Sequence, residues 1–149
     1  MHDVGFTGTR EAGDITQVQR EWLVNWLTVL WASGARRFHH GDCIGADALA
    51  HEIARELGYW IVGHPPTDER YRAFCDVDEM RDPEPFLHRN RTIVNESNIM
   101  LGVPGGYEQL RSGTWSTVRF TEKQGKYALG ILPDGTTFQR PKEAESNDD

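Results

Sequence analysis

The sequence predicts an α/β fold with a doubly wound, mainly parallel five-stranded sheet and helices on both faces. Short β-like runs alternate with helix-like patterns along the chain, which is typical of a parallel sheet covered on both sides. Three short glycine-bearing loops, over residues 8–10, 41–47 and 111–115, follow β-like runs and lead into helix-like patterns. Right-handed crossovers then favour double winding.

Composition indicates one folded domain. The chain has 149 residues, of which 38% are hydrophobic, enough for a substantial core. The net charge is −7, and no basic run of five or more residues occurs. Because sequence-independent DNA binding relies on clustered Lys and Arg, nucleic acid is not an expected partner. A local arginine pocket remains compatible with this composition.

The two cysteines, Cys43 and Cys75, lie in loops without metal-ligand spacing. We therefore predict free thiols in a reducing compartment, with neither a metal site nor a cofactor. No apolar run approaches the ~20 residues of a membrane span, and the first residues lack a signal-peptide pattern. A cytoplasmic protein without membrane contact is the resulting expectation.

In the first half of the chain, Thr16 and Gln19 have the spacing of a capping box at the start of a helix that Gly34 closes. A second amphipathic helix over 46–57 stops at Gly58. The predicted strands of this half cover residues 4–6, 36–39 and 59–62.

In the second half, a polar loop over 64–84 is long enough to be a lid or a substrate-facing segment. The elements predicted after it are helices 85–97 and 114–124 and strands 99–103 and 127–132. We expect the nucleotide-binding domain to span 1–135 and the acidic residues 136–149 to form a disordered tail.

The glycine loops predict an anion site. The first turn of a helix offers unpaired backbone N–H groups and the positive end of the helix dipole. All three loops follow strands, and doubly wound sheets bind ligands at the carboxyl ends of their strands. The sequence thus predicts a pocket for a phosphorylated small molecule of the nucleotide type.

Four motifs resemble those of the SLOG superfamily, a Rossmann-like group that includes the lonely-guy phosphoribohydrolases and the DNA-processing protein A domain. The resemblance covers the chain from the first strand to about Leu132. It implies a Rossmann-like fold, a nucleotide-type ligand and a homodimer. The matching segments are Gly5 to Arg10, His40 to Asp47, Arg89 to Val94, and Pro104 to Gly106 together with Ser112 to Thr114.

Lonely-guy enzymes cleave the N-glycosidic bond of nucleoside 5′-monophosphates with an arginine and a glutamate. Arg89 falls where that arginine would lie. The family's Pro-Gly-Gly-x-Gly-Thr-x-x-Glu motif is interrupted here by residues 107–111, and its glutamate position reads Thr117. Glu108 is the nearest loop carboxylate that could replace the glutamate, with Glu122 as a second choice; solvation at the surface is the alternative role of both.

Individual side chains suggest different parts of a ligand. Arg10 can grip a phosphate through two hydrogen bonds, whereas Asp42 and Asp47 are acceptors suited to ribose hydroxyls. Trp115 can stack on a base or belong to the core. The complete predicted ligand-binding set is Gly8, Thr9, Arg10, Gly41, Asp42, Gly45, Asp47, Arg89, Asn90, Gly105, Gly106, Ser112, Gly113, Thr114 and Trp115, with Arg89 and Glu108 as catalytic candidates.

Three functions are consistent with these residues. The first is nucleotide binding without turnover, in a sensor, carrier or sequestering protein, and it is favoured by intact phosphate loops beside a missing glutamate. The second is an N-glycosidase with a relocated carboxylate. The third is single-stranded DNA binding, which the acidic composition disfavours.

Overall fold

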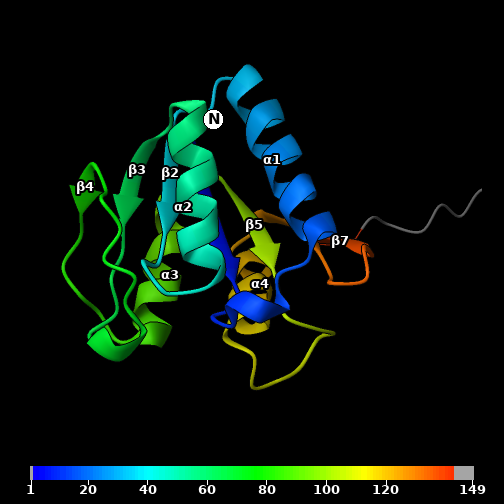
Figure 1. The fold of residues 1–149 in the computed structure, drawn as a ribbon. Coiled ribbons are helices and arrows are strands. Elements are labelled where there is room, and N and C mark those ends of the chain that lie inside the picture. Colours follow the sequence, from blue (N-terminus) through cyan, green and yellow to red (C-terminus); the bar gives the residue numbers. More distant parts are fainter. Residues whose placement is uncertain (1, 143–149) are drawn as a thin grey trace, which may run out of the picture.

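The computed structural model describes residues 2–142 and contains one seven-stranded sheet in the order β4-β3-β2-β1-β5-β6-β7 (Figure 1). All neighbouring strands are parallel except β6 and β7. The strands are β1 (Asp3–Gly8), β2 (Arg37–His40), β3 (Trp60–Gly63), β4 (Glu79–Met80), β5 (Ile99–Val103), β6 (Tyr127–Ile131) and β7 (Thr137–Arg140). The helices are α1 (Gln17–Ala32), α2 (Ala46–Leu57), α3 (Phe86–Glu96) and α4 (Gly113–Lys123), with short 3₁₀ turns η1 (Ala12–Asp14) and η2 (Glu69–Tyr71).

The strand order has a switch point between β1 and β5. The chain moves outward from β1 through β2 and β3 to β4, then returns through α3 to the opposite side of β1 and continues through β5 and β6. Two halves of the sheet therefore wind in opposite directions from β1. In such sheets the loops that follow the two central strands diverge and leave a crevice at the carboxyl edge.

Helices cover both faces of the sheet. Helices α1 and α2 lie on one face, and α3 and α4 lie on the other (Figure 1). The α1–α2 side buries the larger apolar cluster, in which Leu27 and Phe38 are fully enclosed. The α3–α4 side buries a smaller cluster around Met100 and Val118. The predicted doubly wound, Rossmann-like sheet with two covered faces is thus confirmed.

The predicted count of five strands is wrong, because two short edge strands were missed. The first, β4, lies within the predicted 64–84 loop and has only two residues, too few to produce a periodic pattern. The second, β7, lies within the predicted tail and pairs antiparallel with β6. Its Phe138 ring packs 4.6 Å from the Trp115 ring, so apolar contact holds this part of the tail. Residues 143–149 of that tail lie outside the described residues.

The predicted helix-end signals are present. The Thr16 hydroxyl accepts from the Gln19 N–H at 3.3 Å, and the Gln19 side chain accepts from the Thr16 N–H at 3.0 Å, which completes the capping box. Gly58 follows α2 in the left-handed region with φ of 96°, a conformation that costs glycine little. Among the described residues, no helix combines the length and apolar character needed to cross a membrane.

Gln19 also connects α1 to the carboxyl edge of the sheet. It is completely buried, and its amide nitrogen donates to the carbonyls of Pro104 and Ile131 at 2.9 and 3.0 Å. One side chain therefore joins the start of α1, the loop after β5 and the end of β6.

Replacing Gln19 with Leu should lower the free energy of unfolding by about 2–4 kcal/mol, because two buried carbonyls and the partly buried Thr16 N–H lose their partner. Denaturant unfolding at neutral pH measures the change. Gln17→Leu is the matched control, because Gln17 lies two residues earlier on the exposed side of α1. This substitution should change the free energy of unfolding by less than about 0.5 kcal/mol. Equal losses in both variants would contradict the role of Gln19.

Candidate functional site

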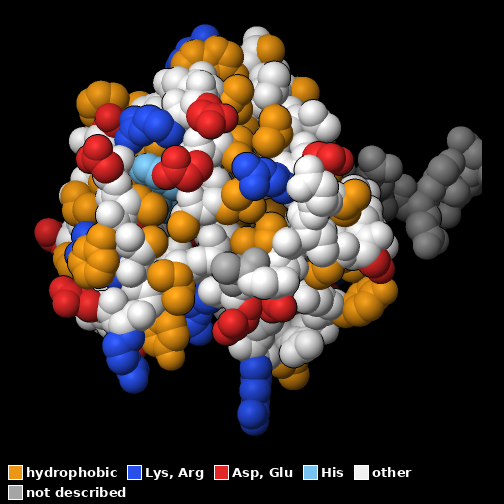
Figure 2. Space-filling view, in the orientation of Figure 1, with side chains coloured by type: hydrophobic (Ala, Val, Ile, Leu, Met, Phe, Trp, Pro, Cys, Tyr) orange, Lys and Arg blue, Asp and Glu red, His pale blue; other side chains and the backbone are white. Residues whose placement is uncertain are grey.

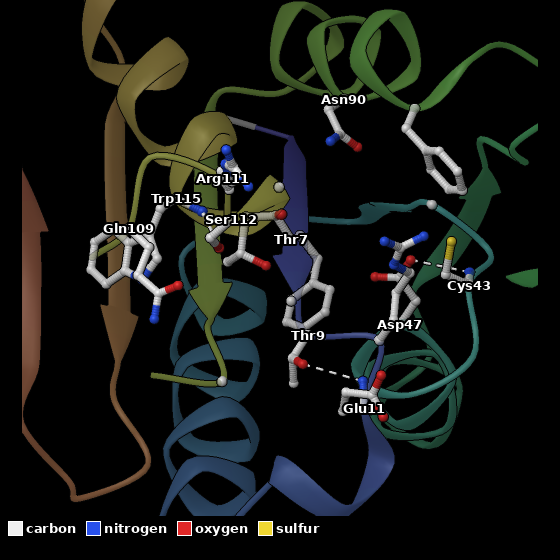
Figure 3. Close-up of a pocket in the computed structure, with 18 of the residues that line it drawn as sticks. Thr7, Thr9, Glu11, Cys43, Asp47, Asn90, Gln109, Arg111, Ser112 and Trp115 are labelled. Carbon is white, nitrogen blue, oxygen red and sulfur yellow. Dashed lines mark hydrogen bonds between the residues drawn. The ribbon is translucent and has the colours of Figure 1, made fainter. Parts of the chain in front are cut away.

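A cavity of about 460 Å³ opens at the carboxyl edge of the sheet, at the switch point between β1 and β5 (Figure 3). Its wall consists of the end of β1 and the loop after it, the loop between β5 and α4, and the first turns of α3 and α4, together with residues at the start of α2. Its size lies in the range of small-molecule sites. The three glycine loops singled out in the sequence do converge on one cavity.

The first turn of α4 presents free donors to this cavity. Ser112 caps the helix, and its hydroxyl accepts from the Trp115 N–H at 3.2 Å. The N–H groups of Gly113 and Thr114 have no acceptor among the described residues. Since these groups line the cavity at the positive end of the helix dipole, they can bind an anion.

Arg89 is the buried cation of the site. Arg89 is 6% exposed. Its guanidinium donates to the carbonyls of Gly41 and His64 and to the side-chain oxygen of Asn90. The Cys43 sulfur, at 3.7 Å, is the one hydrogen-bond acceptor of its Nη2 within the described part of the chain. The carbonyls hold the guanidinium in place, and one of the two hydrogens on Nη2 has no acceptor among the described residues.

Gly41 leaves the space that Arg89 occupies. A Cβ at this position would lie 2.5 Å from Arg89 Nη1 and 2.9 Å from an Asp47 carboxylate oxygen. Any larger residue would displace the guanidinium or the carboxylate. The glycine is therefore required by a close side-chain approach rather than by an unusual backbone angle.

Two carboxyl groups line the other side of the cavity. Asp47 is 7% exposed and accepts from the Cys43 N–H at 3.1 Å. Burial raises the pKa of Asp47 to about 6, although the Arg89 charge opposes this increase. Glu11 lies nearby in the loop after β1, where its N–H bonds the Thr9 hydroxyl at 3.2 Å. Figure 3 shows Asp47 and Glu11 across the cavity from Ser112 and Trp115.

Arg10 has a fixed position at the cavity rim. Its guanidinium carbon lies 4.5 Å from the centre of the Tyr71 ring and 4.7 Å from that of Phe86. Cation–π contacts with both rings hold the side chain where it can meet an anionic ligand.

The structure brings most of the predicted ligand-binding residues together. Thirteen of the fifteen line this one cavity. They are Gly8, Thr9, Arg10, Gly41, Asp47, Arg89, Asn90, Gly105, Gly106, Ser112, Gly113, Thr114 and Trp115. Trp115 also has a structural role, because it is 3% exposed and its Nε1 donates to the Gly106 carbonyl at 3.0 Å.

Asp42 and Gly45 do not line the cavity. The Asp42 carboxylate is fully buried and binds Arg72 Nε and the Cys75 N–H, both at 2.8 Å. The Asp42 carboxylate therefore holds the 64–84 loop in place and is not available to a ligand. Gly45 has φ of +90°, and a Cβ there would lie 2.5 Å from the Arg10 carbonyl. Gly45 therefore packs against the backbone of the loop after β1, on the side away from the cavity lining.

Glu108, the predicted replacement catalytic carboxylate, does not line the cavity either. Its two oxygens pair with Arg119 at 3.0 Å and Arg140 at 2.9 Å. These partners hold the pKa of Glu108 below its usual range. Arg140 belongs to β7, whose existence the sequence did not reveal, so the competing partner of Glu108 could not be anticipated.

Sequence reasoning missed several cavity residues. They are Phe6, Thr7, Glu11, Cys43, Phe86, Ile93, Tyr107, Gln109 and Arg111. Most of them are next to a predicted motif in the sequence, and that position was the one signal that could have identified them.

The 64–84 loop contributes none of the residues that line the cavity, so the hypothesis that this loop is a lid receives no support. Two groups of possible metal ligands, His40/His51/Cys75 and His39/His64/Glu96, lie outside the lining.

Solved structures of other proteins have the same kind of fold as this chain. No family model and no curated protein sequence matches the chain. Similar solved structures include that of TM1055, with a TM-score of 0.64 and 20% identity over 85% of this chain and 71% of the other. The molybdenum cofactor binding protein of Rippkaea orientalis has a TM-score of 0.67 and 17% identity, covering 88% and 76%. The molybdenum cofactor carrier protein of Chlamydomonas reinhardtii has a TM-score of 0.63 and 20% identity, covering 89% and 76%.

The raised pKa of Asp47 predicts a pH-dependent stability. Because the folded pKa of Asp47, about 6, exceeds the usual aspartate pKa of 3.8, the folded protein binds this proton more tightly than the unfolded chain does. The associated stability is present below about pH 4 and is lost as the pH rises through 6. Asp47→Asn should therefore gain on the order of 2 kcal/mol relative to the parent protein between pH 4 and pH 7. Denaturant unfolding across this range measures the difference, and a pH-independent difference would contradict it.

Proposed function

We propose that this protein binds a nucleotide or a similar phosphorylated small molecule in the cavity at the switch point, as a carrier, sensor or sequestering protein. The observation that carries the proposal is the polarity of the cavity. Unpartnered N–H groups of α4 lie on one side, and the carboxyl groups of Asp47 and Glu11 lie on the other (Figure 3).

The α4 side fits a phosphate group. Gly113 and Thr114 supply backbone N–H donors at a helix N-terminus. An anion that displaces water from these donors accepts their hydrogen bonds in its place. The guanidinium of Arg89 lies beside Gly41 and Asp47 rather than at α4, and its buried positive charge adds to the attraction of the cavity for an anion. Together these groups favour an anion over a neutral ligand.

The Asp47 side fits hydrogen-bond donors. A carboxylate accepts from sugar hydroxyls or from the N–H groups of a heterocycle, and it repels a phosphate. A ligand with an anion at one end and hydroxyl or ring N–H donors at the other satisfies both sides. Nucleotides have this arrangement, and Phe6 and Phe86 add apolar surface for a flat ring.

Two of the similar structures are, by name, molybdenum cofactor binding or carrier proteins. This likeness favours carriage over catalysis and adds the molybdenum cofactor to the ligands worth testing. The SLOG resemblance and the homodimer it implies remain part of the same proposal.

Hydrolysis is the second candidate function. Its supporting observation is that Glu11 and Asp47 place carboxyl groups in the cavity, where either could act on a glycosidic bond. Glu108 is not free for this role, because it forms ion pairs with Arg119 and Arg140.

Nucleic-acid binding is less favoured, since Figure 2 shows acidic and basic side chains intermixed on the face in view, with no continuous basic patch.

Gly113→Asp tests the phosphate side directly. A Cβ at Gly113 has no heavy atom within 4 Å, so a side chain fits. A carboxylate at this helix start stabilises α4 through its dipole but repels a phosphate. The affinity for nucleoside 5′-monophosphates, measured by calorimetry, should fall at least about tenfold. Gly113→Asn is the matched neutral control and should retain most of the affinity. Equal affinities in the two variants would contradict a phosphate at α4.

Incubation with a panel of nucleosides and their 5′-monophosphates separates binding from hydrolysis. The monophosphates should raise the melting temperature, whereas the nucleosides should have little effect, because the anion supplies the discrimination. Chromatography should recover each ligand intact. Release of free base that Glu11→Gln abolishes would instead establish the hydrolase.

A further inference from the structure

The arginines that line the cavity differ from most of the others in the chain. Three of the thirteen arginines, Arg10, Arg89 and Arg111, belong to the lining. Seven of the remaining ten form ion pairs with carboxylates. The three lining arginines form no such pair among the described residues. The cavity therefore retains positive charge that carboxylates neutralise elsewhere.

This positive charge exceeds the negative charge of the lining. The lining contains two carboxyl groups, those of Glu11 and Asp47, and the N-terminus of α4 adds the positive end of its dipole. The chain as a whole has a net charge of −7. An excess of positive charge in one cavity of an acidic protein favours an anionic ligand there.

Arg111 lies at the α4 end of the cavity. It immediately precedes Ser112, the residue that caps α4. Figure 3 shows the Arg111 side chain beside those of Ser112 and Trp115. Arg111 is therefore next to the position proposed above for a phosphate, and its charge supports binding there.

Arg10 lies on the opposite side of the switch point from Arg111. Its backbone carbonyl packs against Gly45, at the start of α2. Its guanidinium carbon lies over the rings of Tyr71, in η2, and Phe86, in α3. Because α4 and the residue before it belong to the β5–β6 half of the sheet, a phosphate at α4 leaves Arg10 for another part of the ligand.

The Arg10 guanidinium is held in place but not neutralised. Contact with the ring faces uses none of its five N–H donors, and the side chain has no hydrogen-bond acceptor within the described part of the chain. Glu11, its neighbour in the sequence, forms no ion pair with it there. A guanidinium held in this way can bind two oxygens of a phosphate without losing a hydrogen bond within the protein.

Arg89 adds a second positive charge on this side. Its guanidinium carbon lies 5.5 Å from the centre of the Phe86 ring, and that of Arg10 lies 4.7 Å from the same centre. The carbonyls and Asp47 that surround Arg89 offset its charge, whereas Arg10 has no such partner among the described residues. An anion beside Arg10 relieves the repulsion between the two guanidinium groups.

We propose that the ligand is a nucleotide with a second phosphate group, and that Arg10 binds this phosphate while α4 and Arg111 bind the first. The proposal rests on the proposed function, because it requires a nucleotide whose 5′-phosphate lies at α4. The second phosphate is either on the 3′ oxygen of the ribose or the β-phosphate of a 5′-diphosphate. Asp47 binds hydroxyl or ring N–H donors of the same ligand.

Calorimetric titration with three forms of each common ribonucleoside tests the proposal. The forms are the 5′-monophosphate, the 5′-diphosphate and the 3′,5′-bisphosphate. The form whose second phosphate reaches Arg10 should bind at least about tenfold more tightly than the monophosphate of the same nucleoside. The identity of that form distinguishes a β-phosphate from a 3′-phosphate.

Substitution of Arg10 assigns the gain in affinity to its side chain. Arg10→Met removes the charge but keeps an unbranched side chain against the two rings, and the ratio of the two affinities should fall to about one. Arg10→Lys keeps the charge and should retain a larger ratio than Arg10→Met does. Arg20→Gln is the matched control, because Arg20 is an exposed arginine of α1 that does not line the cavity. It should keep the ratio of the parent protein.

Three results would overturn the second phosphate site. They are equal affinities for all three forms in the parent protein, an unchanged ratio in folded Arg10→Met, and an equal loss of the ratio in Arg20→Gln. Binding of the monophosphate in these cases leaves the proposed function standing. Absence of binding by every form contradicts both proposals. Circular dichroism establishes that each variant is folded.

Discussion

The buried guanidinium of Arg89 is the interaction on which the candidate site depends. Removing a charge from water costs several kcal/mol unless hydrogen bonds and an opposite charge compensate. Here the compensation comes from the ends of three elements: the carbonyl after β2, the carbonyl after β3 and the carboxylate of Asp47 in α2. Arg89 therefore joins α3 to the opposite half of the sheet, and it places a positive charge at the cavity.

The sheet topology explains why the remaining groups meet Arg89. Reversal of the winding direction between β1 and β5 separates the loops that follow these strands. The loop after β1 brings Arg10 and Glu11, and the long loop after β5 delivers the N-terminus of α4. The segment after β3 also takes part, since the carbonyl of His64 accepts from Arg89.

Much of the fold was predictable because it depends on local signals. Capping residues, helical periodicity and the glycine after α2 fixed most helix ends, and alternation of element types indicated the parallel sheet. Edge strands β4 and β7 were not predictable in this way. Strand β4 has only two residues, and β7 has a single apolar residue, Phe138, among polar ones, so neither shows a strand pattern.

The candidate site was predictable where backbone chemistry defines it and less so where side chains compete for partners. Gly113 and Arg89 follow from motif positions, and they line the cavity. Asp42 and Glu108 are equally plausible in the sequence, but arginines from other segments engage both. The contact between the His39 and His64 rings was missed because the two residues come from β2 and from the segment after β3, so no sequence spacing reveals it.

Mapping backbone amide shifts by NMR during titration with a nucleoside 5′-monophosphate, and separately with the nucleoside, determines whether a phosphate binds at the N-terminus of α4. We expect the monophosphate to shift the amides of Gly113 and Thr114 most, together with those of the loop after β1. The nucleoside should leave the α4 amides nearly unchanged. Shifts confined to another surface, such as the groove between α3 and α4 around Leu87 and Phe120, would contradict it.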